Sequence, residues 1–404
     1  MKEVIAISEK MRRIEADLND IFPEREFLIR QIIMALLTKE HIMVYGEYGT
    51  AKSDLTRTLF ETITDGEVFS IALTKFMAES SFIGIPNPKI MAEEGRLEYD
   101  VNSGILVADF VELDEFLDAS DPTQRTFLGI LNERVFKRGR QTELARLHTA
   151  VASTNGNPRE ALANKDDLGA VLDRFLYWSH VGYLKEPESR LKMYAKYLSG
   201  SKPAETVSLA ELQKISKVVV NPCQITDPEI IEVYDMVIEA VAEHSLDGKV
   251  SDRRKCKLTT LLEANAIYHG RYEVYLDDIA AVRYGILDNS DPDKVAHVDE
   301  IIANIIETYK VERAKSNPDD AYLDLLGKYD EEVQAVLNNG FDQMPFDELS
   351  NVVADLQEIR SKVENITPGL PKVQEKRMQI LSDVDALVER AIARFTQSNQ
   401  RVTI

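Results

Sequence analysis

The first 185 residues alternate between two hydrophobic patterns. Short apolar runs of strand type occur at 41–46, 68–73, 104–115, 148–154 and 176–183. Residues 4–38 have the three-to-four-residue spacing of two helices separated at Pro23, and similar spacing returns at 53–63, 122–136 and 164–176. Strands that alternate with helices are typical of a mainly parallel sheet covered on both faces, so residues 25–185 are predicted to form an α/β core.

From residue 186 the strand signals stop and helical spacing takes over. The helical segments lie at 187–198, 208–219, 227–244, 251–270 and 275–287, and the polar stretch 288–293 follows them. Farther on, apolar residues recur every three or four positions across 349–366 and again across 381–395, with a Pro/Gly turn at 367–371. Two amphipathic helices around such a turn predict an antiparallel hairpin. It is expected to pack on its own chain, with a partner-binding arm as the alternative.

These patterns predict three regions. We expect an α/β core in residues 1–185, an all-helical domain in residues 186–290, and a helical C-terminal region in residues 291–404 that contains the hairpin. A chain of 404 residues exceeds one ordinary core, which agrees with several domains.

Charge and composition narrow the classes of function. The net charge of −21 argues against tight non-specific binding to DNA, RNA or anionic lipid, which needs clustered Lys and Arg. No apolar run is long enough to span a bilayer, and the N-terminal segment lacks the features of a signal peptide. Cys223 and Cys256 are interpreted as reduced structural thiols. We therefore expect a cytoplasmic protein with no membrane association.

The stretch GEYGTAKS follows a predicted strand and precedes a predicted helix, the context that a phosphate-binding loop requires. Lys52 would reach the β- and γ-phosphates, Ser53 would offer its hydroxyl to Mg²⁺, and backbone N–H groups would cradle the phosphates. Alanine favours helix, so Ala51 in place of the usual glycine is acceptable if it needs no positive φ. The predicted nucleotide-binding residues are Gly46, Glu47, Tyr48, Gly49, Thr50, Ala51, Lys52, Ser53 and Asp54.

The strand run FVELDEF ends in the acidic pair Asp114 and Glu115. Ligands of parallel sheets bind at the carboxyl ends of the strands, where this pair would lie. Asp114 would hold the Mg²⁺ shell together with Ser53, and Glu115 would polarise the attacking water. Glu112 is an acid inside a mainly apolar strand; it is expected to face either an adjacent crevice or a partnered interior.

Asn155 follows the next predicted strand and could orient the water beside the γ-phosphate. LDRF and SDRR place arginines at helix ends, where an arginine that reaches the γ-phosphate can raise the rate by orders of magnitude.

In order and spacing these segments resemble the MoxR branch of the AAA+ ATPases, and within it the RavA-type members. The resemblance covers about residues 8–290, and alanine before the loop lysine is typical of the branch. It implies that Lys52 and Ser53 belong to Walker A, Asp114 and Glu115 to Walker B, and Asn155 to sensor 1. It further implies that Arg174 is the arginine finger given to a neighbouring subunit. Sensor 2 would be Arg253, with Arg254 beside it as the alternative. Residues 79–104 resemble the helix-2 insertion that lines the opening of the ring.

The resemblance implies an ATP- and Mg²⁺-dependent ATPase that works as a homo-oligomeric ring, most commonly a hexamer. Family members remodel protein clients, often with a von Willebrand factor A domain protein, so both kinds of partner are expected. A nucleic-acid-dependent motor is one alternative, which the low pI and the lack of a basic stripe disfavour. A nucleotide-binding scaffold with little turnover is another, which the acidic pair and the finger disfavour.

Overall fold

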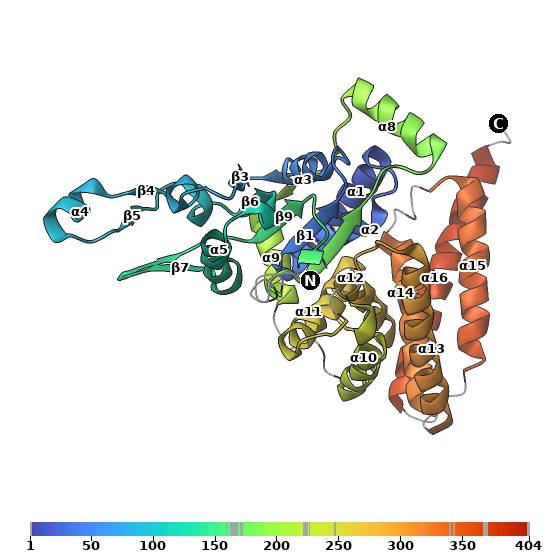
Figure 1. Ribbon diagram of the computed structural model, residues 1–404. Coiled ribbons are helices and arrows are strands. Elements are labelled where there is room, and N and C mark those ends of the chain that lie inside the picture. The colour runs from blue at the N-terminus through green and yellow to red at the C-terminus, as the bar shows by residue number, and fades with distance from the viewer. Residues whose placement is uncertain are drawn as a thin grey trace. The chain divides into compact units, whose positions relative to one another are not determined.

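The computed structural model forms two compact units, residues 1–305 and 306–404. It describes residues 2–158, 160–161, 169, 173–220, 225, 227–245, 248–316, 318–338, 341, 344–366 and 371–401. Figure 1 labels the elements of both units. Each unit is treated by itself below.

The first unit is built on a five-stranded parallel sheet with strand order β10-β1-β9-β6-β3. The strands are β1 (Ile42–Gly46), β3 (Val68–Ala72), β6 (Phe110–Asp114), β9 (Thr149–Thr154) and β10 (Tyr177–Val181). All five coincide with predicted strand runs, although the run at 104–115 is a strand only in its second half. Its first half forms a short 3-10 turn, Gly104–Leu106.

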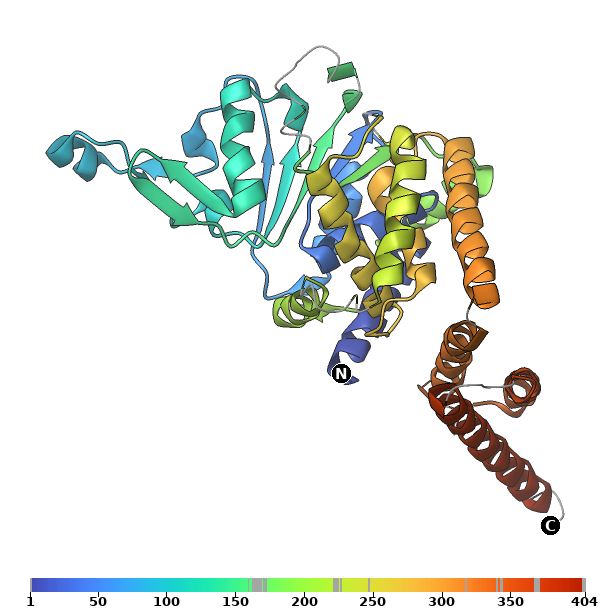
Figure 2. The same cartoon turned by 90° about the horizontal axis from the view of Figure 1, so that it is seen from below.

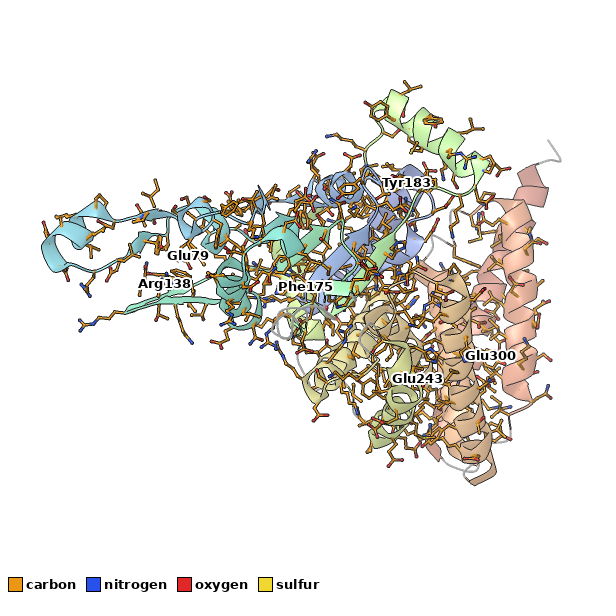
Figure 3. All side chains as sticks on the ribbon, in the orientation of Figure 1. Glu79, Arg138, Phe175, Tyr183, Glu243 and Glu300 are labelled. Atoms are coloured by element: carbon orange, nitrogen blue, oxygen red, sulfur yellow. The ribbon has the colours of Figure 1, made fainter. Side chains whose placement is uncertain are left out.

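Helices cover both faces of this sheet, as the continuous burial of β1 and β9 requires. α2 (Glu26–Thr38) packs on β1 and β10, α3 (Lys52–Phe60) packs on β6 and β9, and α1 (Lys2–Ile21) packs on α2 and α3. On the opposite face α5 (Asp121–Glu133) packs into an aromatic core that includes Phe116, Phe127 and Phe175. Figure 2 shows α5 beside the strands, and Figure 3 labels Phe175 at the centre of the unit. The predicted AAA+-type α/β core is confirmed.

Two hairpins project from this core in Figures 1 and 2. One consists of β4 (Ile85–Pro86), α4 (Pro88–Glu94) and β5 (Tyr99–Asp100), and the other of β7 (Val135–Arg138) paired with β8 (Gln141–Leu144). Glu79 and Arg138, labelled in Figure 3, form an ion pair of 3.3 Å where the two hairpins meet. The prediction of a helix to residue 136 was wrong at its end, because Arg134 adopts φ +56° and stops α5 before β7.

Helices dominate after β10, as predicted. They are α8 (Pro187–Ser199), α9 (Leu209–Val219), α10 (Pro228–Val241), α11 (Asp252–Tyr268) and α12 (Arg283–Ile286), together with the 3-10 segments η4 (Ala242–His244) and η5 (Leu276–Val282). The expectation of no strand in this region was wrong, because the region contains one short strand. β11 (Val207–Ser208) pairs with β2 (Ile63–Thr64), which also ends α3 earlier than predicted.

α13 (Pro292–Ser316) contains the division between the two units. In the second unit, α14 (Pro318–Asn338), α15 (Phe346–Glu364) and α16 (Pro371–Arg401) pack as three helices around one apolar core. Arg360 of α15 pairs with Asp385 of α16 at 2.7 Å, and Arg377 donates to the Val363 carbonyl, so the two helices are antiparallel. The predicted hairpin is confirmed and packs against α14 of its own chain, while its turn at 367–370 lies outside the described residues.

Candidate functional site

The loop after β1 has the geometry of a phosphate cradle at a helix N-terminus. Gly46 has φ +140°, and a Cβ there would lie 2.1 Å from the Val181 carbonyl oxygen of β10, so only glycine fits. Gly49 also has a positive φ of 69°, with open space where a side chain would begin. α3 begins at Lys52, so the N–H groups of its first turn point toward the mouth of the loop.

Ala51 is a correction to the sequence analysis. The residue was expected to be acceptable if it needed no positive φ, yet it adopts φ +62° and ψ +26°, the left-handed region. A non-glycine residue in this region is strained by steric contact between its Cβ and the backbone. The loop therefore keeps the backbone conformation for which glycine is favoured, and alanine carries the strain.

Lys52 lies inside the cradle, with 8% of its surface exposed. Its Nζ donates to the Glu47 carbonyl at 2.7 Å, to the Gly46 carbonyl at 3.1 Å and to the Asn155 Oδ1 at 3.0 Å. Burial lowers the pKa of Lys52, and the carboxylates of Glu115 and Asp114 oppose that shift. The ammonium group is thus already aimed into the loop, where phosphate oxygens could replace the carbonyls.

The acidic pair lies at the carboxyl end of β6, next to the loop. Asp114 Oδ1 accepts hydrogen bonds from the Ser153 hydroxyl and, at 3.1 Å, from the Glu115 N–H. Glu115 adopts φ +53° just after the strand, which turns its side chain away from the sheet direction. Burial first, and then the neighbouring charges of Asp114 and Asp118, raise the pKa of Glu115.

Asn155 joins the two halves of this arrangement. Its Oδ1 accepts from Lys52, while its Nδ2 donates to Glu115 Oε1. The structure therefore brings Lys52, Asp114, Glu115 and Asn155 into one hydrogen-bonded set at the carboxyl ends of β1, β6 and β9. The sequence analysis did not identify Ser153 as a site residue. The pairing of β6 with β9 indicates it, because Leu113 pairs with Ala152 and Ser153 therefore lies beside Asp114.

Two hollows adjoin the loop. One of about 460 Å³ is lined by Gly46–Tyr48, Asn155, Asn157, His180 and Ser290. The other, of about 220 Å³, is mainly apolar and lies between Ile21–Pro23, Gly49–Ala51, Tyr183–Leu184 and the side chains of Arg190 and Met193. An apolar slot next to a phosphate cradle has the character of a nucleobase site.

The remaining predicted loop residues are less enclosed. Ser53 is half-buried in the first turn of α3, whereas Glu47, Tyr48 and Asp54 are exposed. Thr50 donates its hydroxyl to the Glu47 carbonyl at 2.8 Å, which tightens the loop. Ser53 and Asp114 offer the hard oxygen donors that Mg²⁺ prefers, with positions left for water and phosphate, so the residues present fit such an ion.

Arg174 and Arg253 lie together but apart from this set. Arg253 donates to Asn132 of α5, and its Nη1 lies 3.8 Å from Asp173. Arg174 pairs with the same Asp173 at 3.3 Å. The contacts of these arginines are with α5 and the segment before β10, whereas Lys52 contacts the loop and Asn155. Within the described residues, neither arginine forms a hydrogen bond or ion pair with Lys52, Asp114, Glu115 or Asn155.

The choice between Arg253 and Arg254 follows from burial. Arg254 is 8% exposed, and its Nη2 donates to the carbonyls of Leu176 at 2.8 Å and Gly285 at 2.6 Å. It ties α11 to β10 and α12, whereas the side chain of Arg253 is 30% exposed. Arg253 is thus the more accessible of the two, and its role as sensor 2 stays a prediction.

Glu112 lies in a partnered interior, one of its two expected environments. It is 6% exposed, and its Oε2 accepts from the Ser70 hydroxyl of β3 at 3.0 Å. Burial raises the pKa of Glu112, although the Ser70 hydrogen bond and the charge of Arg57 oppose the shift.

Comparison with known proteins identifies the family. Residues 9–219 match the model for the MoxR domain of MoxR–vWA–β-propeller ternary systems, and residues 229–302 match an AAA lid domain. The chain belongs to the MoxR family of AAA+ ATPases. The matches leave the RavA-type branch as a prediction.

Relatives agree with this assignment. The chain is 26% identical over 304 residues to an uncharacterised protein of Methanocaldococcus jannaschii, covering 75% of this chain and 76% of that one. It is 25% identical over 212 residues to the chaperone MoxR1 of Mycobacterium tuberculosis, covering 52% and 54%. A solved structure of a protein thought to be an ATPase from Cytophaga hutchinsonii shares the fold. It has a TM-score of 0.55 and 21% identity over 76% of this chain and 96% of that one.

Three structural facts complete the description. Within the described residues, no group of three or more His, Cys, Asp or Glu side chains is arranged to hold a metal ion. No helix in the same part of the chain is long and apolar enough to cross a bilayer. Cys256 is exposed and free, and Cys223 lies outside the described residues.

Proposed function

We propose that this protein hydrolyses Mg²⁺-ATP. The observation that carries the proposal is the hydrogen-bonded set of Lys52, Asn155 and Glu115, with Asp114 at its edge. Lys52 would hold the β- and γ-phosphates, and the first turn of α3 would receive their remaining oxygens. A bound Mg²⁺ would supply charge neutralisation between the phosphates, held through Ser53 and Asp114.

Glu115 would position the attacking water and accept its proton, with Asn155 fixing the carboxylate. Its raised pKa supports this role, because a carboxylate of higher pKa is a stronger base. Asp114 would stay bonded to Ser153, which keeps its other oxygen directed to the ion shell. The apolar hollow beside Gly49–Ala51 would take the nucleobase.

The active site would be completed by a second copy of the chain. Arg174 and Arg253 lie side by side around Asp173, away from the phosphate loop of their own chain. A neighbour in a closed ring, predicted to be a hexamer, would present both arginines to the γ-phosphate. Turnover would then depend on assembly, and the function would be remodelling of a protein client. The matched family model describes MoxR–vWA systems, which supports a von Willebrand factor A domain partner.

ATP turnover by Lys52→Ala and Glu115→Gln tests the assignment, with Glu61→Gln as the control because Glu61 is an exposed carboxylate at the end of α3. Both site variants should lose turnover, and Glu115→Gln should still bind ATP. Turnover that persists in both would contradict the site. ATP binding without turnover in the unmodified protein would support the scaffold hypothesis instead.

Mixing tests the shared site. Lys52→Ala chains and Arg174→Ala chains should each be inactive alone. In an equal mixture about a quarter of the interfaces of a randomly assembled ring would pair an intact loop with an intact arginine. Partial recovery of turnover is expected, and no recovery would count against a site formed between subunits.

A further inference from the structure

Asp173 contacts both of the arginines that the proposed function gives to a neighbouring copy. Its Oδ2 lies 3.3 Å from Nη1 of Arg174 and 3.8 Å from Nη1 of Arg253. Its Oδ1 accepts a hydrogen bond of 2.9 Å from the Ser251 hydroxyl, so both carboxylate oxygens have partners. The side chains of Asp173, Arg174 and Arg253 are 28%, 22% and 30% exposed, and solvent therefore screens their charges only in part.

The partners of Asp173 come from two parts of the chain. Arg174 lies just before β10, within the residues that match the MoxR domain, whereas Ser251 and Arg253 belong to the region that matches the lid. Ser251 is the N-cap of α11, because its side-chain oxygen accepts from the Arg254 N–H. A carboxylate next to a helix N-terminus also meets the positive end of the helix dipole. Asp173 therefore ties the first turn of α11, and the arginine in it, to the α/β core.

The Asp173 carboxylate allows two guanidinium groups to stay side by side. Both lie close to the same oxygen, and two cations so near to each other repel unless a negative charge lies between them. The two contacts are longer than the roughly 2.7–2.9 Å of a strong charge-assisted hydrogen bond. Phosphate oxygens could therefore replace the Asp173 oxygen without breaking a strong pair. The carboxylate orients both side chains and can release them to a phosphate group.

We propose that Asp173 is a positioning residue, which holds Arg174 and Arg253 as a pair for the γ-phosphate bound by a neighbouring copy. The inference rests on the proposed function, in which these arginines complete the neighbour's site. Without the charge of Asp173 both guanidinium groups are still present, but their repulsion moves them apart. A displacement of about 1 Å can cost about a hundredfold in rate, and an arginine at the γ-phosphate acts on the transition state. The loss should therefore appear in kcat, while ATP binding by the loop of the other chain should change little.

Asp173→Asn tests the role of the charge, because the amide oxygen can still accept from the Ser251 hydroxyl. In the full-length protein with Mg²⁺-ATP, kcat should fall at least about tenfold and KM should change less than about threefold. Asp299→Asn is the matched control: Asp299 pairs with Arg283 at 2.6 Å in the same unit, and this variant should keep the kcat of the unmodified protein. A kcat of Asp173→Asn equal to or above that of the unmodified protein would overturn the inference.

Mixing shows in which subunit Asp173 acts. When Asp173→Asn chains are combined equally with Lys52→Ala chains, about a quarter of the interfaces join an intact loop to the well-placed arginines of a Lys52→Ala chain. Turnover per chain should then reach about a quarter of that of the unmodified protein, which exceeds the turnover of either variant alone. Asp173→Asn chains mixed with Arg174→Ala chains should show no gain, because neither chain offers well-placed arginines.

The outcomes separate the role of Asp173 from the shared site. Recovery with Arg174→Ala chains but not with Lys52→Ala chains would place the effect of Asp173 in the chain that binds ATP, and would overturn the positioning role. No recovery with either, while Lys52→Ala and Arg174→Ala chains restore turnover together, would also overturn it and leave the shared site standing. If Lys52→Ala and Arg174→Ala chains do not restore turnover together, the shared site is wrong and the role of Asp173 falls with it.

Discussion

Ala51→Gly is expected to stabilise the protein, against the usual effect of glycine. In the left-handed conformation observed at φ +62°, alanine costs about 1–2 kcal/mol relative to an unstrained backbone. Glycine removes that strain but adds unfolded-state entropy worth about 0.5–1 kcal/mol. The difference leaves a gain of roughly 0.5–1 kcal/mol in the free energy of unfolding. Ala51 is exposed, so no cavity forms.

Two variants provide the comparison. Ala16 is exposed in the middle of α1, where glycine should cost about 1 kcal/mol. Gly49→Ala should also cost about 1 kcal/mol, because Gly49 has φ +69° and no atom lies within 4 Å of an added Cβ. The first comparison removes a Cβ from ordinary helix, and the second adds one to a left-handed residue.

Urea unfolding without nucleotide, followed by tryptophan fluorescence, measures all three variants. Trp178 is the sole tryptophan of the chain and is buried in β10, so its signal reports on the α/β core. Ala51→Gly and Ala16→Gly should differ by about 1.5 kcal/mol at similar slope. If both lose the same stability, the left-handed strain at residue 51 does not exist.

Three further predictions follow from the same contacts. Arg254→Ala should lower the free energy of unfolding by about 2–4 kcal/mol in the tryptophan assay, because it leaves the buried carbonyls of Leu176 and Gly285 without this donor. Arg253→Ala should change the free energy of unfolding by less than about 0.5 kcal/mol but should lose ATP turnover. The reverse pattern would contradict the assignment. Asn155→Ala should reduce kcat at least about tenfold, since Glu115 and Lys52 both lose their shared partner. The measurement is steady-state turnover at saturating ATP, and a kcat equal to that of the unmodified protein would refute this prediction. Glu112→Gln should increase the free energy of unfolding more at pH 8 than at pH 5. Burial raises the folded-state pKa of Glu112, so the cost of burying its charged carboxylate is present above the unfolded-state pKa and fades as the pH falls toward that value. A pH-independent effect in paired urea titrations would argue against the raised pKa.

Much of the α/β core could be predicted because β1, β6, β9 and β10 are almost entirely buried, whereas only the edge strand β3 is largely exposed. Such strands read as short continuous apolar runs, and all five were recognised from them. The β7–β8 hairpin was missed, because Val135 and Phe136 continue the helical spacing of α5. Only the left-handed conformation of Arg134 separates the two elements, and arginine gives no sequence signal for it.

The site was predicted in its residues but not in its internal contacts. Spacing placed Lys52, Asp114 and Asn155 at the ends of neighbouring strands, which suffices to bring them to one edge of a parallel sheet. It could not show that Asn155 contacts both Lys52 and Glu115, because that depends on side-chain rotamers. The positive φ of Ala51 was equally hidden, since alanine is a helix-favouring residue and the strain is imposed by the turn from β1.

The sequence analysis left open which of Arg253 and Arg254 is sensor 2, but helical phase already separates the surroundings of the two side chains. Arg254 lies four, seven and eight residues before Leu258, Leu261 and Leu262, all fully buried, so it shares the inward face of α11. Its charge is therefore met by backbone carbonyls inside the chain. Arg253, about 100° away around the helix, points out of that face toward Asp173 and Asn132. An arginine in phase with the core serves the fold, and one out of phase can serve a neighbour's nucleotide.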